Sequence, residues 1–196
     1  MRHRNMDRTG SSSASDARQS LADALGRVAR GSEPALQQVY ESTSAKLFGL
    51  ILRILGDKGE AEDALQEVYV SVWRRAASFD AAKASPVTWL AAIARNRAID
   101  RLRASGRPRP AEPIDAAHEV ADERPDALAR LETREETARL DGCIGELEAR
   151  QSSAIRSAFF GGFSYPELAD QEGVPLGTMK SWVRRGLLRL RDCLER

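Results

Sequence analysis

A proline-rich interruption between two long stretches of helical periodicity constrains this fold more than any other feature of the sequence. Apolar residues recur at spacings of three and four from Leu21 to about residue 104, and again from about residue 128 to 196, which is the period of an amphipathic helix. Between residues 105 and 125 that period fails, and acidic residues are mixed with Gly106, Pro108, Pro110, Pro113 and Pro125. Such clusters are typical of a linker. We therefore expect an all-α protein with two small helical domains joined by a flexible linker.

The same pattern predicts where each part begins and ends. Residues 1–19 are rich in Ser, Arg and Asp and lack a large aliphatic side chain, so they cannot bury enough surface to offset the entropy of ordering, and we expect a disordered tail. The first domain is expected over residues 20–104, an acidic linker over 105–127, and the second domain over 128–196. If extended, the linker could span on the order of 70–80 Å at about 3.3 Å per residue.

Helix start and stop signals subdivide the first domain. One helix is expected between Pro34 and Gly56, a second over about residues 59–77, and a third from the N-cap Ser85 to about residue 104, because proline and serine favour helix starts and glycine favours ends. The apolar stripe of the second helix is residues 61, 65, 68, 72 and 76. Its opposite face consists of Asp63, Gln66, Glu67, Val70 and Arg74.

The second domain has the signature of a helix-turn-helix. A charged helix is expected over about residues 128–147 and another through residues 154–160, before two glycines. Ser164 and Glu167 then form an S-x-x-E capping box at the start of a short helix. After a connection at residues 174–177, a last helix carries the apolar stripe Met179, Val183, Leu187, Leu190 and Leu194. A short helix, a tight turn and a long amphipathic helix make this motif.

The near-neutral total charge hides strong local polarity. The chain has 30 Lys and Arg against 29 Asp and Glu, a net charge of +1. Residues 57–67 contain five acids and one Lys, residues 95–109 contain six Arg and one Asp, and residues 174–191 contain five basic residues and no acid. Because binding depends on where charges lie, this total does not exclude a nucleic-acid partner.

The basic residues of the last helix are candidates for binding duplex DNA. The second helix of a helix-turn-helix enters the major groove with its N-terminal half, so side chains opposite the apolar stripe should reach bases or phosphates: Thr178, Lys180, Ser181, Arg184 and Arg185. The alternative is a solvated basic face, which the capped helix and turn make the less favoured interpretation.

The third helix of the first domain is also basic. It carries Arg95, Asn96, Arg97, Arg101 and Arg103 on more than one face. Phe79 and Trp89 flank the preceding loop, and aromatic rings beside cations suit single-stranded bases. The alternative places both rings in the core, and pattern alone favours it for Trp89. The acidic Asp63, Gln66 and Glu67 would repel phosphates, so they either bind a basic protein surface or form a solvated face.

Several classes of protein are disfavoured. The longest apolar runs, such as residues 47–55, fall far short of the roughly 20 residues that a membrane span needs, and no apolar stretch follows the N-terminal charges, so neither membrane insertion nor a secretory signal is expected. We expect a cytoplasmic protein.

The scattered cysteines and histidines indicate no metal or cofactor. Cys143, Cys193, His3 and His118 form neither a zinc cluster nor a disulfide framework, so both thiols are expected to be ordinary core or surface helix residues. A helical enzyme is disfavoured because neither histidine lies in a predicted domain and no nucleophile motif accompanies them.

Three ordered segments resemble the extracytoplasmic-function sigma factors of RNA polymerase, in the sigma-70 family. They are EDALQEVYVSVWRRAASFD, TWLAAIARNRAIDRLR and FFGGFSYPELADQEGVPLGTMKSWVRRGLLRLRDCL, separated by the acidic linker, and the resemblance covers about residues 21–196. It implies a first domain, sigma-2, that binds the beta-prime clamp helices of core polymerase and captures the melted −10 element. It implies a second, sigma-4, that binds the beta flap and the −35 element.

The resemblance also implies roles for particular residues. Asp63, Gln66 and Glu67 match the clamp-binding face. Asn96 matches the pocket for a flipped base, and Phe79 matches an aromatic position near it. The basic Arg95 and Arg97 beside Asn96 are further candidates for binding the −10 element. Trp73 matches a core aromatic. The −35 positions match Lys180, Ser181, Arg184 and Arg185, with Thr178 at the helix start. In two departures, Trp182 stands where the family commonly has Arg, which would alter the −35 preference, and Glu148 replaces a frequent proline and is expected to be silent.

The expected function is therefore a promoter-specificity subunit without catalytic chemistry, monomeric when free and controlled by an anti-sigma factor. One alternative is a helix-turn-helix regulator whose first domain senses a ligand or dimerises. Another is a helical adaptor without transcriptional activity.

Overall fold

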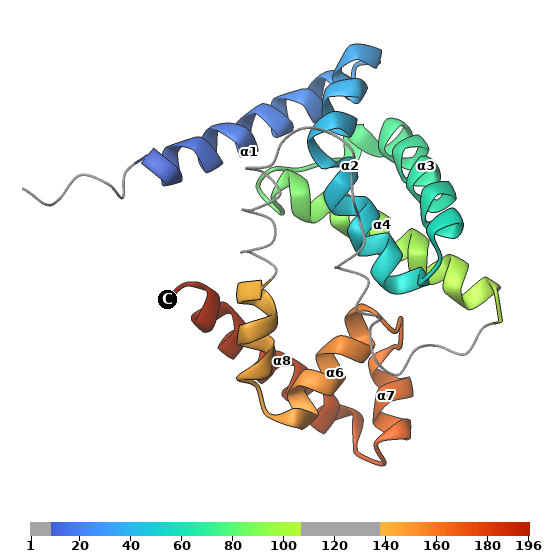
Figure 1. Cartoon of the computed structure of the whole chain (residues 1–196), viewed down its shortest axis with the longest axis vertical. Helices are drawn as coiled ribbons and strands as arrows, with labels where there is room; N and C mark the ends of the chain where they lie inside the picture. Colours follow the sequence, from blue (N-terminus) through green and yellow to red (C-terminus); the bar gives the residue numbers. More distant parts are fainter. Residues whose placement is uncertain (1–8, 107–137) are drawn as a thin grey trace, which may run out of the picture. The chain divides into compact units, whose positions relative to one another are not determined.

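The computed structural model describes residues 9–106 and 138–196, and within these ranges every regular element is a helix (Figure 1). The described part divides into two compact units at Arg101 and Leu102, near the end of one helix. The all-α expectation is confirmed. The predicted linker from residue 107 onward and the predicted helix over residues 128–137 lie outside the described residues. No described helix is long and apolar enough to cross a membrane.

The first unit begins with two helices, α1 (Thr9–Val28) and α2 (Glu33–Leu55). The tail predicted over residues 1–19 is wrong for residues 9–19, which form the start of α1. Once the buried part of α1, including Leu21 and Leu25, is helical, each further residue adds a backbone hydrogen bond at low entropic cost. Polar residues 15–20 can therefore remain helical although they are exposed.

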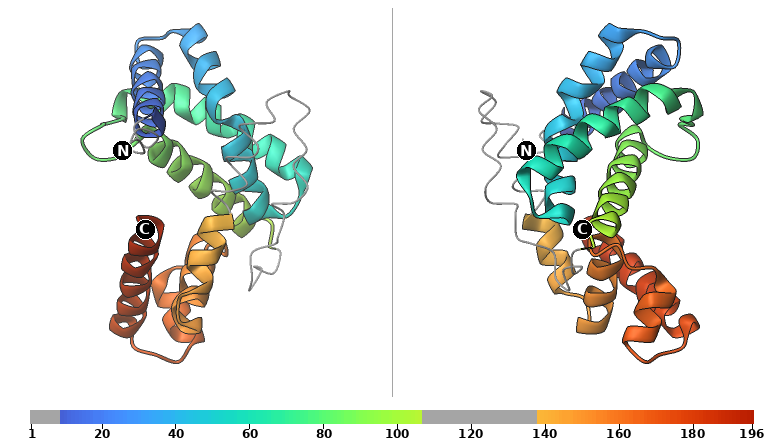
Figure 2. Two further views of the ribbon diagram at one scale, coloured as in Figure 1. Left: turned by 60° about the vertical axis from the view of Figure 1, so that its left-hand side comes forward. Right: turned by 90° about the vertical axis from the view of Figure 1, so that its right-hand side faces the viewer.

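A two-residue corner joins α2 to α3 (Lys58–Arg75). Gly56 ends α2 in the left-handed region at φ 70° and donates its N–H to the carbonyl of Leu52 at 2.8 Å, a conformation that favours glycine. Asp57 then caps α3 by accepting the N–H of Glu60 at 2.9 Å. The chain turns back, so that α3 runs beside α2 (Figures 1 and 2).

A short 3₁₀ turn, η1 (Ala76–Ser78), and a loop lead from α3 into α4 (Pro86–Ala104). Ser85 accepts the N–H of Thr88 at 3.2 Å, which confirms the predicted cap. The core of the unit is made by fully buried side chains of all four α-helices: Leu25, Val28, Val39, Ile51, Ile54, Val68, Val72 and Leu90.

One buried hydroxyl pair joins α2 to α3 within this core. The hydroxyls of Thr43 and Tyr69 lie 2.8 Å apart, and Thr43 also donates to the carbonyl of Val39 at 2.6 Å. Burial raises the pKa of Tyr69 to about 12, against a lowering by the Thr43 hydrogen bond.

The second unit contains the predicted helix-turn-helix. Its described elements are a helix over residues 138–145, α6 (Ala149–Phe159), α7 (Tyr165–Gln171) and α8 (Leu176–Leu194). The capping box is confirmed: Ser164 Oγ accepts the Glu167 N–H, and the Glu167 carboxylate accepts the Ser164 N–H at 2.7 Å. The core gathers around Met179 and Val183 of α8, Ile155 of α6 and Leu168 of α7.

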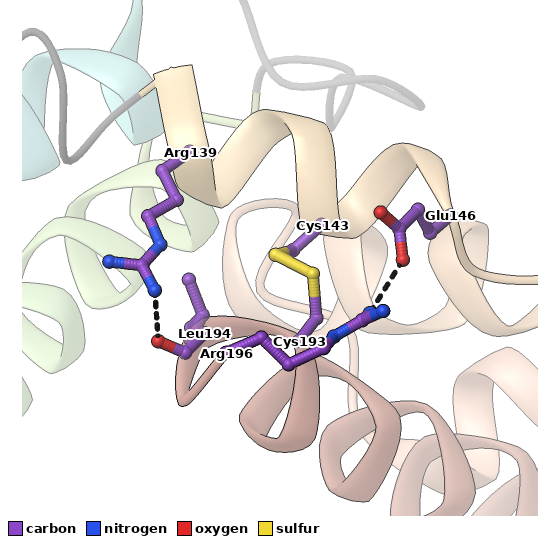
Figure 3. Close-up of a disulfide and its surroundings, with 6 residues drawn as sticks. All are labelled: Arg139, Cys143, Glu146, Cys193, Leu194 and Arg196. Carbon is purple, nitrogen blue, oxygen red and sulfur yellow. Dashed lines mark hydrogen bonds and ion pairs between the residues drawn. A yellow bond between two sulfur atoms is a disulfide. The ribbon is translucent and has the colours of Figure 1, made fainter.

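The 138–145 helix is covalently joined to the end of α8 (Figure 3). Cys143 and Cys193 form a disulfide with Cα atoms 5.8 Å apart. Beside it, Arg139 donates to the carbonyl of Leu194 at 2.7 Å, and Arg196 donates to the carboxylate of Glu146 at 2.9 Å. The expectation that the two cysteines are ordinary thiols is wrong, because helix packing brings together residues 50 positions apart, a contact that spacing alone does not reveal.

Candidate nucleic-acid interface

The polar face of α3 points away from the core, as the sequence predicts. Ala61, Leu65 and Val68 are buried on the inner face, and a helix that buries one stripe exposes the opposite one. Asp63 and Gln66 are exposed, whereas Glu67 is partly buried. The three residues predicted to bind polymerase therefore share one face, with Glu67 the least accessible.

Two arginines of α4 form an ion-pair cluster with this face. Arg97 Nε lies 3.3 Å from Glu67 Oε2. Arg101 Nη2 lies 3.8 Å from both Asp63 Oδ2 and Glu67 Oε1, and its Nε lies 3.8 Å from Glu60 Oε2. Residues that the sequence assigned to two binding sites, Arg97 for DNA and Glu67 for protein, are thus in direct contact.

Exposed apolar side chains continue the α3 face towards its C-terminus. Val70 is 49% exposed and Trp73 is 37% exposed. The expectation that Trp73 is a core aromatic is wrong, because it follows Val70 by three residues and Gln66 by seven and so lies on the outer side. That helical spacing was a signal in the sequence that could have identified it.

Phe79, at the start of the loop before α4, packs against Trp89 near the start of α4. The rings of Phe79 and Trp89 meet edge to face with centroids 5.6 Å apart, and both side chains are partly buried. In the loop, Asp80 accepts the N–H of Ala82 at 3.0 Å and pairs with Lys83 at 3.1 Å. On α4, Asn96 is exposed and Arg95 is partly buried.

The basic side chains of α8 line its outer face. Lys180, Arg184 and Arg185 are exposed, whereas Thr178 and Ser181 are partly buried near the start of the helix. An open hollow beside them is lined by Tyr165, Lys180, Val183, Arg184, Leu187 and Leu188. The predicted apolar stripe is correct at Met179 and Val183, but Leu187 is 37% exposed.

Beyond Val183, the inward face of α8 continues at Gly186, where α6 packs closely against it. Gly186 is buried, and a Cβ at this position would lie 2.6 Å from Ile155 Cδ1. The two helices therefore pack at Gly186, and Leu187 and Leu188 are left on the outside.

The two sequence departures from the family pattern both have structural contacts. Trp182 is partly buried against the core of the second unit, and the Arg150 guanidinium lies 5.5 Å from the centre of its ring. Glu148 precedes α6 and accepts a hydrogen bond from Arg189 Nη1 at 2.8 Å, and the same nitrogen lies 3.3 Å from Gln151 Oε1. Glu148 therefore links the start of α6 to α8 through an exposed ion pair.

Comparisons with known protein families agree with both units. The chain matches Sigma-70 region 2 over residues 39–108 and Sigma-70, region 4 over residues 137–190. The class defined by this order of two helical regions is that of sigma-70-type factors.

Curated relatives give the narrower assignment. The chain is 37% identical to the ECF RNA polymerase sigma factor SigK of Mycobacterium ulcerans over 177 residues, which cover 87% of this chain and 91% of the relative. It is 36% identical over 172 residues, with the same coverage, to SigK of Mycobacterium tuberculosis strain H37Rv. The chain belongs to the family of ECF RNA polymerase sigma factors.

Solved structures include similar chains. Rhodobacter sphaeroides SigE, solved in complex with the anti-sigma ChrR, is 34% identical, with a TM-score of 0.43 and coverage of 89% of this chain and 97% of that one. CnrH, solved in complex with the cytosolic domain of CnrY, is 19% identical, with a TM-score of 0.43 and coverage of 90% and 97%.

Proposed function

We propose that this sigma factor directs promoter-specific initiation by docking its first unit on core RNA polymerase and on the melted −10 element, and its second unit on the −35 element. The observation that carries the proposal is the placement of charge: carboxylates on the outer face of α3, and five basic residues without an acid over residues 174–191 of the second unit. The chain would supply no catalytic chemistry and would act in the cytoplasm with polymerase.

Asp63, Gln66 and Glu67 are the proposed contact for core polymerase, on the beta-prime clamp helices. A carboxylate face is suited to a basic protein surface, since it would repel the phosphates of DNA. The second unit is proposed to bind the beta flap as well as the promoter.

The −35 element is proposed to be read by α8. Lys180, Arg184 and Arg185 are exposed on the face opposite Met179 and Val183, where the recognition helix of this motif meets the major groove. Arginine can donate two hydrogen bonds to guanine. Thr178 is the proposed phosphate contact at the helix start, and Ser181 is proposed to reach a base or a phosphate.

The −10 element is proposed to be held by the loop before α4 and the exposed face of α4. Asn96 is exposed and can hydrogen-bond an unstacked base, while Phe79 offers the edge of a ring already supported by Trp89. Arg95 and Arg97 are the proposed phosphate contacts.

An anti-sigma factor is the proposed regulatory partner. Rhodobacter sphaeroides SigE, which is 34% identical in sequence, was solved in complex with the anti-sigma ChrR. The free chain is proposed to be monomeric. The family assignment disfavours the alternatives of a ligand-sensing or dimerising helix-turn-helix regulator and of an adaptor.

Run-off transcription with core polymerase on a genomic library tests the proposal and identifies the promoter. We expect specific transcripts only when the chain and core polymerase are both present, and no promoter shift by the free chain at physiological salt. Replacing Arg184 and Arg185 by Ala should reduce initiation by weakening upstream contact. Tight promoter binding by the free chain, or promoter use unchanged by the double substitution, would contradict the proposed roles.

A further inference from the structure

Glu67 is the most heavily paired carboxylate on the proposed polymerase-binding face. Its Oε2 faces Arg97 Nε at 3.3 Å, and its Oε1 faces Arg101 Nη2 at 3.8 Å. Both oxygens of this side chain are therefore directed at arginines of α4. A basic side chain of polymerase that approached Glu67 would compete with at least one of these arginines for the same oxygens.

The two arginines are held to different extents. Arg101 is 26% exposed, contacts three carboxylates and also donates from Nη1 to the carbonyl oxygen of Glu60 at 3.1 Å. Arg97 is 40% exposed, and its contacts on α3 are Glu67 and a long hydrogen bond to Ser71 Oγ at 3.5 Å. Of the two, Arg97 is the one that a competitor can displace.

Arg97 also adjoins the proposed base-binding position. It directly follows the exposed Asn96 on α4, so a guanidinium released from α3 would lie one residue from the side chain proposed to hold an unstacked base. In the free chain, its charge is instead partly neutralised by Glu67. A basic group paired with a carboxylate contributes less to the attraction of phosphates.

On these contacts, and resting on the proposed function, we propose that Glu67 and Arg97 mask each other in the free chain, and that docking of polymerase on Glu67 releases Arg97 to contact the phosphates of the melted strand. The polymerase-binding and DNA-binding surfaces of the first unit are then coupled through one ion pair. By linkage, each partner raises the affinity for the other by the same factor.

The size of this coupling is bounded by exposure. Glu67 is 44% exposed and Arg97 is 40% exposed, and ion pairs that accessible to solvent change equilibria by up to about fivefold. The Glu67–Arg97 ion pair therefore makes a small contribution to the binding free energy, in addition to other contacts. Substitutions should show graded effects rather than complete loss of binding.

Binding of a fluorescein-labelled single-stranded thymidine homopolymer to the full free chain tests the masking. We expect Glu67→Gln to bind the strand about two- to fivefold more tightly at low salt, with a steeper salt dependence by about 0.7 in the logarithmic slope for one added phosphate contact. Glu62→Gln is the matched control, because it removes the same charge from the same helix at a residue that pairs with Lys58.

Second-site and charge-preserving variants separate masking from net charge. The gain should disappear in the Glu67→Gln, Arg97→Gln double variant. Glu67→Asp keeps the charge but shortens the side chain, so it should show a smaller gain in the same direction, and it replaces Glu67→Gln if that variant does not fold. Equal gains for Glu62→Gln and Glu67→Gln, or a gain that persists without Arg97, would overturn the proposal.

The release step predicts that the effect of Arg97 depends on polymerase. When Arg97→Gln is introduced alone, it should change strand binding by the free chain little. The same substitution should reduce open-complex formation by the holoenzyme. An equal effect in both states would reject release. The strand titrations use no polymerase, so they can reject masking even if the chain supports run-off transcription. The absence of run-off transcripts would instead reject the proposed function.

Discussion

Asn96 and Arg97 are neighbours on α4, but their side chains have different surroundings. Substitutions at these two positions should therefore affect different binding partners. Arg97 contacts Glu67 on α3, whereas Asn96 is exposed. A substitution at Asn96 should therefore leave the ion-pair cluster and the folding of the unit intact, and its effects should be confined to the nucleic acid.

Replacing Asn96 by Ala should remove discrimination at one base of the −10 element. We expect a loss of about 1–3 kcal/mol in the preference between bases at that position, as for a lost bidentate contact. Run-off assays on promoters that differ at single −10 positions measure this preference. The affinity for core polymerase serves as the control. A drop in that affinity would contradict the assignment of Asn96 to the DNA interface.

The buried Tyr69 predicts a specific loss of stability at alkaline pH. Since its pKa in the folded chain is about 12 against about 10 when unfolded, the folded state holds this proton more tightly. The stabilisation is complete below pH 10 and is lost as pH rises towards 12, by up to about 2–3 kcal/mol. Urea unfolding of wild type and Tyr69→Phe across this range isolates the contribution, and parallel pH profiles would contradict it.

The packing of α8 against α6 depends on a residue without a side chain. A Cβ at Gly186 would lie 2.6 Å from Ile155 Cδ1 and 3.3 Å from Gln151 Cβ, and both of these residues are buried. The basic outer face of α8 is therefore positioned by an inner face that leaves no space at this crossing.

Replacing Gly186 by Val should force the two helices apart. We expect the second unit to lose about 1–3 kcal/mol of unfolding free energy, which is the usual cost of overpacking a core. Chemical denaturation followed by Trp182 fluorescence, with Trp73 and Trp89 replaced by Phe, measures it, because Trp182 packs on the core of this unit. Gly177→Ala is a suitable control, since a Cβ there meets no atom within 4 Å. Equal stability of the two variants would show that the crossing can relax.

Sequence periodicity predicted the helices better than it predicted their faces. The caps at Ser85 and Ser164 are local and were predicted correctly. Periodicity placed Leu187 on the buried stripe, but its exposure depends on which neighbouring helix covers that side, and the prediction was wrong. The core position of Trp73 was implied by the family resemblance and was also wrong, although helical spacing places it on the outer side. The helical start of α1 was missed because composition alone does not show that a polar segment extends a packed helix.

Contacts between helices could not be read from motifs. The sequence identified Glu67 and Arg97 as candidates, but their opposite charges and the family resemblance assigned them to separate sites, and nothing local showed that the two side chains meet. Cys143 and Cys193 were left unpaired because they lie 50 positions apart. Such pairings follow from tertiary packing, which spacing along one helix does not encode.

For the whole molecule, the disulfide predicts that the two units respond differently to reduction. A cross-link between residues 50 apart removes chain entropy from the unfolded state worth about 4 kcal/mol. We expect reductant, or Cys193→Ser, to lower the unfolding midpoint of the second unit only. Trp182 reports on that unit in a variant with Trp73 and Trp89 replaced by Phe. A reductant-sensitive midpoint in the first unit, or no shift in the second, would contradict the prediction.

The exposed outer face of α8 has a further consequence for how such proteins diversify. Lys180, Arg184 and Arg185 are exposed on α8, and the candidate polymerase contacts are on α3 of the other unit. If α8 reads the −35 element and α3 binds polymerase as proposed, one copy could, after gene duplication, acquire a new promoter preference through a few substitutions on α8, while its α3 face continued to fit the same polymerase. A bacterium could in this way evolve new sets of co-expressed genes without any matching change in its transcription machinery.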